Sequence, residues 1–228
     1  MEPRFGRLYS ATVLRPLAEQ LVAELDVRPG ETVCDLLCDS GTLGAAFAGA
    51  VGENGRVVLV DSDVALPDAA SCDRVGSLCT FGFWPHTSML DEAMRITRPG
   101  GVAAMVAWDP DDPPAHERAL VDALREVAGI DSRFLRQCLA APASGESDGW
   151  DIGHLRDVVR FDGIAQYWVA MVLERPRLTE IAGASELTVS ALRRACEAGL
   201  RPYIAADGTM RIPVTATMWR RTKRIEDS

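Results

Sequence analysis

The chain has 228 residues, 47% of them hydrophobic, and a formal net charge of −9. This length fits one α/β domain, and the apolar content is enough for a packed core, which excludes global disorder. The acidic balance argues against nucleic acid or an anionic membrane as a partner.

The N-terminus has no apolar signal-peptide core, and no apolar run is long enough to span a membrane. We therefore expect a cytoplasmic protein that is not bound to a membrane. The six cysteines form no CxxC pair and lack zinc-like spacing to histidine, which predicts free thiols and no metal site.

The first half of the chain alternates helical and strand patterns. Residues 10–25 carry apolar side chains at helical spacing, and Thr32–Leu37 is a short apolar run typical of a buried parallel strand. Thr42–Val51 is an alanine-rich helix, and the strand Arg56–Val60 follows it and ends at Asp61. Strand, glycine-bearing turn, helix, strand and acidic residue predict the first βαβ unit of a Rossmann-like fold.

Further elements continue this pattern. A third strand is expected at Arg74–Thr80, a helix from Thr87 or Ser88 to Arg98, and a fourth strand at Val102–Trp108 after the Arg-Pro-Gly-Gly turn. The remaining expected elements are helices at 116–127, 162–173 and 186–200 and strands at 150–161 and 212–218. We interpret 1–228 as a single domain, with an N-terminal helical region at about 1–30, a Rossmann-like core at 31–132, and a shortened cap with C-terminal strands at 133–228.

Four segments, in order and in register with these strands, resemble one family. They are VCDLLCDSG at 33–41, VVLVDSD at 57–63, the strand–helix–strand stretch 73–108, and the segment 201–214. Together they resemble class I S-adenosylmethionine-dependent methyltransferases of the type 11 or UbiE-like group. The resemblance implies a mostly parallel, twisted sheet with helices on both faces and an antiparallel last strand. It also implies S-adenosylmethionine at the loop containing Asp35, Leu37, Asp39 and Gly41, with its ribose bound by Asp61.

Two residues of the first motif depart from the family pattern. After Asp35 the family carries glycines at positions 37, 39 and 41, whereas this chain has Leu37, Asp39 and Gly41. Glycine lets the backbone approach a ligand and adopt positive φ. Leu37 instead places a four-carbon side chain where the cofactor would approach. Asp39 places a negative charge at the helix N-terminus, which favours anions such as the methionine carboxylate.

The link between Asp61 and Asp73 is also shorter than the family pattern. A helix, a strand and both turns do not fit into it, since a parallel crossover needs roughly a dozen residues or more. One strand–helix unit is therefore expected to be missing, together with the wall around adenine; Asp63 is the candidate for the acid that reads the adenine amino group. The segment 140–153 is likewise short and polar. A missing strand would expose a sheet edge, which favours a homodimer.

Several residues are candidates for substrate chemistry. The two carboxylate oxygens of Asp61 match a vicinal diol. Methyl transfer needs mainly proximity and alignment, and a general base helps when the acceptor must lose a proton; His86 and His116 are the candidates for that base or for a substrate contact. Four aromatic residues either line an apolar small-molecule pocket or pack in the core: Trp84, Trp108, Tyr167 and Trp168.

Three functional hypotheses follow from these patterns. The first is a methyltransferase-like protein with an eroded S-adenosylmethionine site, serving without methyl transfer as an accessory protein partner, regulator or small-molecule binder. The second is an active methyltransferase acting on a small molecule, and the third is a cyclase or isomerase that reuses the substrate cavity. The loop lacks G-x-G-x-x-G, which argues against a nicotinamide dehydrogenase.

Overall fold

The computed structural model of this chain describes residues 6–38, 41–61, 65–79, 89–109, 111–129, 148–174 and 186–225. The chain begins with a helical run made of α1 (Arg7–Tyr9), the π-helical turn η1 (Ser10–Leu14) and α2 (Arg15–Glu24). Its apolar side chains are buried at helical spacing, as the sequence predicted. No helix within these ranges is long and apolar enough to cross a membrane.

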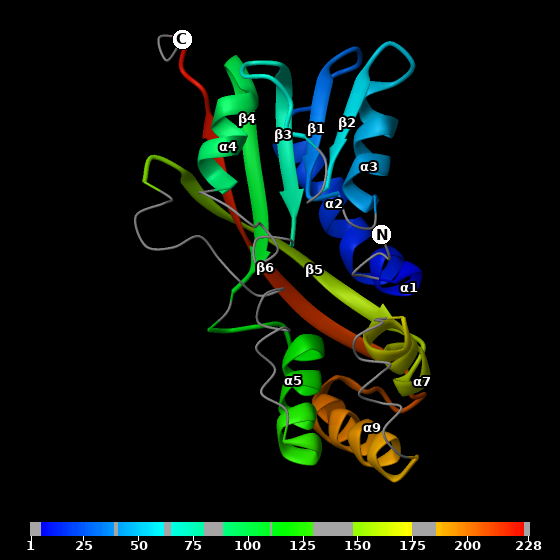
Figure 1. Cartoon of the computed structure of the whole chain (residues 1–228). Helices are drawn as coiled ribbons and strands as arrows, with labels where there is room; N and C mark the ends of the chain where they lie inside the picture. The colour runs from blue at the N-terminus through cyan, green and yellow to red at the C-terminus, as the bar shows by residue number, and fades with distance from the viewer. Residues whose placement is uncertain are drawn as a thin grey trace.

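The centre of the molecule is a mixed sheet in the order β2-β1-β3-β4-β6-β5 (Figure 1). Its parallel part consists of β1 (Thr32–Leu36), β2 (Arg56–Val60), β3 (Cys72–Leu78) and β4 (Thr97–Trp108). The strand β6 (Met210–Thr222) runs antiparallel to both β4 and β5 (Asp151–Phe161). The predicted Rossmann-like sheet with an antiparallel last strand is therefore confirmed.

Helices cover both faces of the sheet, and the strand patterns show why. In β4, Ala104 and Val106 belong to one apolar cluster, while Ala103 and Met105 belong to another. Since neighbouring side chains of a strand point to opposite faces, the two clusters lie on opposite faces of the sheet. The first cluster includes side chains of α2 and of α3 (Thr42–Val51), and the second includes those of α4 (Met89–Ile96).

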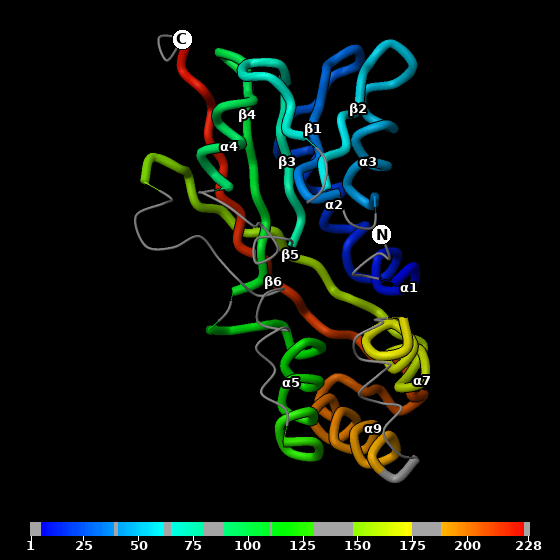
Figure 2. The backbone as a smooth tube through the Cα atoms, viewed as in Figure 1, coloured from blue at the N-terminus to red at the C-terminus, as the bar shows by residue number. Residues whose placement is uncertain are grey.

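The lower halves of β5 and β6 extend beyond the parallel strands and reach a group of helices (Figure 2). This group contains α5 (Ala115–Ala128), α7 (Ile164–Trp168) with its π-helical continuation η3 (Val169–Leu173), and α9 (Glu186–Leu200), which ends in the short 3₁₀ helix η4 (Arg201–Tyr203). The helix α5 packs against α9. Over the first half of β6, buried positions alternate with exposed ones, which is the pattern of a strand with one covered face.

The strand β2 lies at the edge of the sheet. Within the described ranges it pairs with β1 alone, and residues 65–71, which lead into β3, contain no strand. This arrangement agrees with the missing strand–helix unit that the short link predicted.

The boundaries differ from the sequence prediction at several elements: β3 begins at Cys72 rather than Arg74, β6 spans Met210–Thr222 rather than 212–218, and the largest difference lies between α4 and β4. The helix before β4 was expected to reach Arg98, but α4 ends at Ile96 and β4 already begins at Thr97. Thr97 pairs with Cys72 of β3, and its hydroxyl donates to the Ala93 carbonyl at 2.6 Å, which caps the end of the helix. Tertiary pairing thus extends the strand back through the glycine-rich turn.

Candidate functional site

The predicted cofactor site lies at the carboxyl ends of the first two strands. Leu37 follows β1, and Asp61 follows β2 directly. In the parallel register Leu36 is level with Val60, so Leu37 and Asp61 are at the same height of the sheet. The Cys38 amide donates to the Val60 carbonyl at 2.9 Å and holds the two strand ends together. This edge of an open α/β sheet is where such folds bind ligands.

Leu37 adopts a left-handed backbone conformation, which in proteins is most often adopted by glycine. Its φ is 60°, in the left-handed region, and its side chain is 1% exposed. The side chain belongs to the apolar cluster that also contains Val60, Met89 and Leu90. A left-handed conformation costs a non-glycine residue about 1–2 kcal/mol, and burying a leucine contributes about 1.5–3 kcal/mol. Burial therefore offsets the strain, and the loop keeps its shape with a side chain inside the protein.

Asp35 and two glycines shape the start of α3. Asp35 is 2% exposed, and its Oδ2 accepts the Gly44 amide at 2.8 Å. A carboxylate at this position satisfies an amide of the first helical turn and complements the positive end of the helix dipole. Gly41 precedes the helix with φ of 69°. Among the predicted cofactor residues, Asp35 thus contacts the helix N-terminus, and Asp61 is half-buried at the end of β2.

Four predicted site residues fall outside the described ranges. Asp39, Asp63, Trp84 and His86 belong to segments 39–40, 62–64 and 80–88. Their roles remain predictions.

The predicted substrate residues Trp108, His116 and Tyr167 come together in the core. The rings of Trp108 and His116 lie edge to face, with centroids 5.6 Å apart. The Tyr167 hydroxyl donates to the His116 carbonyl at 2.8 Å. Trp168 is also buried. The structure therefore places His116 inside the core rather than at an open substrate mouth, and its role as a base or substrate contact stays a prediction.

Two residues of this buried cluster were not predicted as site residues. Tyr9 donates its hydroxyl to Glu117 Oε1 at 2.7 Å, and the same oxygen lies 3.9 Å from His116 Nε2. Glu117 is 1% exposed. A buried carboxylate needs such a donor, because desolvation of a charge is expensive. The sequence signal that could have identified Glu117 is an acidic residue on the inward face of an amphipathic helix. Its partner Tyr9 lies 108 residues away along the chain.

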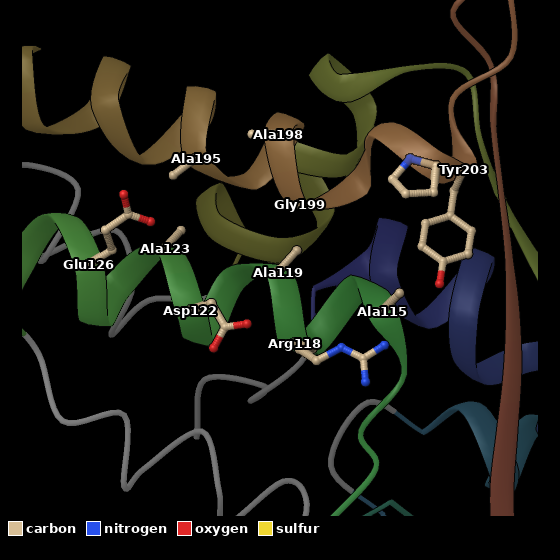
Figure 3. A pocket seen from close by; sticks show the side chains of 11 residues that line it. Ala115, Arg118, Ala119, Asp122, Ala123, Glu126, Ala195, Ala198, Gly199 and Tyr203 are labelled. Carbon is tan, nitrogen blue, oxygen red and sulfur yellow. The ribbon is translucent and has the colours of Figure 1, made fainter.

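A groove of about 340 Å³ lies between α5 and α9 (Figure 3). Its sides include the small residues Ala119, Ala195 and Gly199, and Arg118, Asp122 and Glu126 of α5 lie along it. Arg118 also pairs with Asp112 at 3.1 Å. Among the residues that the structure describes, Pro202 and Tyr203 of η4 also line the groove, and no predicted site residue within those ranges does.

Buried thiols occur in and near the sheet. A hydrogen bond with Cys72, together with burial, raises the pKa of Cys34 far above its ordinary value, so this thiol stays protonated. Burial raises the pKa of Cys196 to about 12. Within the ranges that the structure describes, no group of three or more His, Cys, Asp or Glu residues could hold a metal ion.

Comparison with solved structures identifies the fold of this chain. No protein-family model and no curated protein matches the chain. A protein of Anabaena variabilis, named as a methyltransferase from an antibiotic biosynthesis pathway, superimposes with a TM-score of 0.57 at 13% identity, over 91% of this chain and 96% of that one. A protein of Bacillus halodurans, also named as a methyltransferase, gives a TM-score of 0.49 at 12% identity, over 91% and 98% of the two chains. The Anabaena likeness shows that this chain has the class I methyltransferase fold.

Proposed function

We propose that this protein keeps the methyltransferase fold without transferring methyl groups, and that it serves as an accessory partner, a regulator or a small-molecule binder. The observation that carries the proposal is Leu37, whose buried side chain stands at a position where the family pattern has glycine.

The loop after β1 supports this proposal through its packing. Bare backbone at residue 37 would let a cofactor approach the strand end closely. The Leu37 side chain instead belongs to the cluster shared with Met89 and Leu90, at the start of α4. Moving it out would expose a leucine that is now 1% accessible, at a cost of about 1.5–3 kcal/mol. A ligand that displaced this side chain would have to offset that cost.

The edge of the sheet gives independent support. Small-molecule sites usually enclose most of their ligand's surface. A further strand and helix beyond β2 would supply one side of an adenosine pocket, and β2 has only β1 as a strand neighbour within the described ranges. Adenosine at Asp61 would consequently have less protein around it.

Calorimetric titration with S-adenosylmethionine and with S-adenosylhomocysteine tests the proposal. We expect no binding at micromolar concentrations by the natural chain, because residue 37 carries a packed leucine side chain where the family pattern has glycine. Micromolar affinity for either compound, lost in Asp61→Ala, would overturn the proposal. Leu36→Ala, which alters a buried neighbour of Leu37 in β1, controls for a general loss of stability.

An active small-molecule methyltransferase is the second candidate, because the loop keeps its shape. Both Leu37 and Gly41 have positive φ, and Asp61 sits at the end of β2. This candidate requires that Asp61→Ala abolish cofactor binding and that Leu37→Gly retain or improve it. His86 or His116 would then serve as the base where the acceptor must lose a proton. The same titrations distinguish the two candidates.

A further inference from the structure

We infer that a second copy of this chain docks along the outer edge of β2 and the exposed face of α3, so that two sheets join across a two-fold axis. Backbone hydrogen bonds show which residues face outward. The Arg56 amide donates to the Glu31 carbonyl, next to β1, at 3.0 Å. The Val60 carbonyl accepts from the Cys38 amide on the same side at 2.9 Å. Because peptide groups alternate along a strand, those of Val57 and Leu59 point away from β1. An edge of this kind is a template for pairing with another strand.

The helix beside this edge has an unusual surface. The ten residues of α3 include no charged side chain, and the exposed ones include Ala45, Ala48 and Gly49. Leu59 lies beneath the helix, since a Cβ added to Gly44 would come 2.5 Å from its Cδ2, yet Leu59 is 48% exposed. A solvent-facing helix normally presents polar residues. Figure 1 shows α3 as the outermost helix at the β2 end of the sheet, where a neighbouring copy would meet it.

Antiparallel pairing of β2 with β2 of a second copy fits these surfaces. With Val58 opposite its own counterpart, Val57 of each copy lies opposite Leu59 of the other, and all four side chains share the α3 face. A two-fold axis perpendicular to the sheet then brings the two α3 helices side by side on that face. Helix–helix distances depend on the side chains at the contact, and alanine and glycine allow the closest approach.

The charges at the two ends of β2 favour the antiparallel orientation. The strand begins with Arg56 and is followed by Asp61. Antiparallel pairing places Arg56 of each strand within one residue of the level of Asp61 of the other, whereas parallel pairing would bring like charges together. The net charge of −9 on each chain opposes association, so added salt should strengthen the dimer.

The size of the contact sets its strength. The helix α3 is about 15 Å long and β2 about 17 Å, which gives a patch of roughly 300 Å² per copy. A standard stable interface buries about 800 Å² per partner. The expected dimer is therefore weak and transient.

Sedimentation velocity over about 1–500 µM protein tests this inference. The weight-average mass should rise from 24.7 kDa toward twice that value, at lower concentration in higher salt. Ala48→Arg should weaken association at least about tenfold. Ala198→Arg, at another exposed helical alanine on α9, is the matched control and should leave association unchanged.

A backbone variant tests the pairing itself. Val57→Pro removes an amide that points away from β1, so the monomer should keep its circular dichroism spectrum while association falls. A natural chain that stays at 24.7 kDa throughout would overturn the inference. So would a folded Val57→Pro that associates normally, or a control that weakens association as much as Ala48→Arg.

Discussion

Replacing Leu37 by glycine and by alanine separates the backbone strain at this residue from the packing of its side chain. Leu37 has φ of 60° and is 1% exposed, while its neighbour Leu36 is equally buried in strand β1. The two leucines therefore differ in backbone conformation more than in burial. The same pair of substitutions at each position gives a matched comparison.

The magnitudes predict opposite orders at the two positions. Truncating a buried leucine to alanine costs about 2–5 kcal/mol at either residue. At Leu37, glycine regains about 1 kcal/mol relative to alanine, because only glycine adopts positive φ without strain. At Leu36, glycine loses about 0.5–1 kcal/mol relative to alanine through the added freedom of the unfolded chain. Packing outweighs strain, so every variant is less stable than the natural chain.

Urea denaturation of the four variants measures these differences in the free energy of unfolding. We expect the glycine variant to be more stable than the alanine variant at residue 37, and the alanine variant to be more stable than the glycine variant at residue 36. If Leu37→Ala equals or exceeds Leu37→Gly in stability, the left-handed backbone assigned to this loop is wrong, and so is the account of why the family pattern has glycine there.

Three further changes test other parts of the structure. Gly101→Ala should destabilise the fold by about 1–3 kcal/mol, because the added Cβ would meet backbone oxygens at 2.7 and 2.9 Å. As its control, Gly49→Ala in α3, where the added Cβ would meet open space, should stabilise the fold by about 0.5–1 kcal/mol. Thermal melts at low protein concentration measure both changes. Tyr9→Phe removes the donor to buried Glu117 and should cost about 1–3 kcal/mol in urea unfolding. Burial raises the pKa of the Cys196 thiol from 9.0 to about 12 in the folded chain. Stability should thus be unaffected by this thiol below pH 9 and fall by up to about 4 kcal/mol from pH 9 to 12, a loss that Cys196→Ala should lack.

Local patterns in the sequence were sufficient to predict the parallel half of the sheet. The run at 32–37, the alanine-rich helix and the strand ending at Asp61 each have one clear period and a suitable turn between them, and β1, α3 and β2 lie where these patterns predict. The end of α4 was wrong by two residues because Thr97 pairs with Cys72, a contact that no local pattern reveals.

The candidate site was predicted less completely for the same physical reason. The sequence identified Leu37 as the residue that departs from the family pattern, but the direction of its side chain depends on Met89 and Leu90, more than fifty residues away along the chain. It also placed His116 near a substrate opening. The structure buries this residue beside Tyr9, whose helix is distant in sequence and therefore invisible to spacing arguments.

In the function that we propose, the two departures from the family pattern would act on the same ligand from different sides. Leu37 packs a side chain into the core at a position where the family pattern has glycine, and the short link after Asp61 leaves β2 with β1 as its strand neighbour in the described parts of the sheet. Either change alone would weaken a cofactor site. Together they would reduce both the close approach of the backbone to the cofactor and the protein surface that encloses it. The sheet remains stable with both departures, because neither removes the hydrogen bonds between its strands. The ladders of β1 with β2 and β3 are intact, and Asp35 still accepts a hydrogen bond from the first turn of α3. A fold stabilised by its ladders and core would therefore remain stable after the loss of the cofactor pocket that we propose.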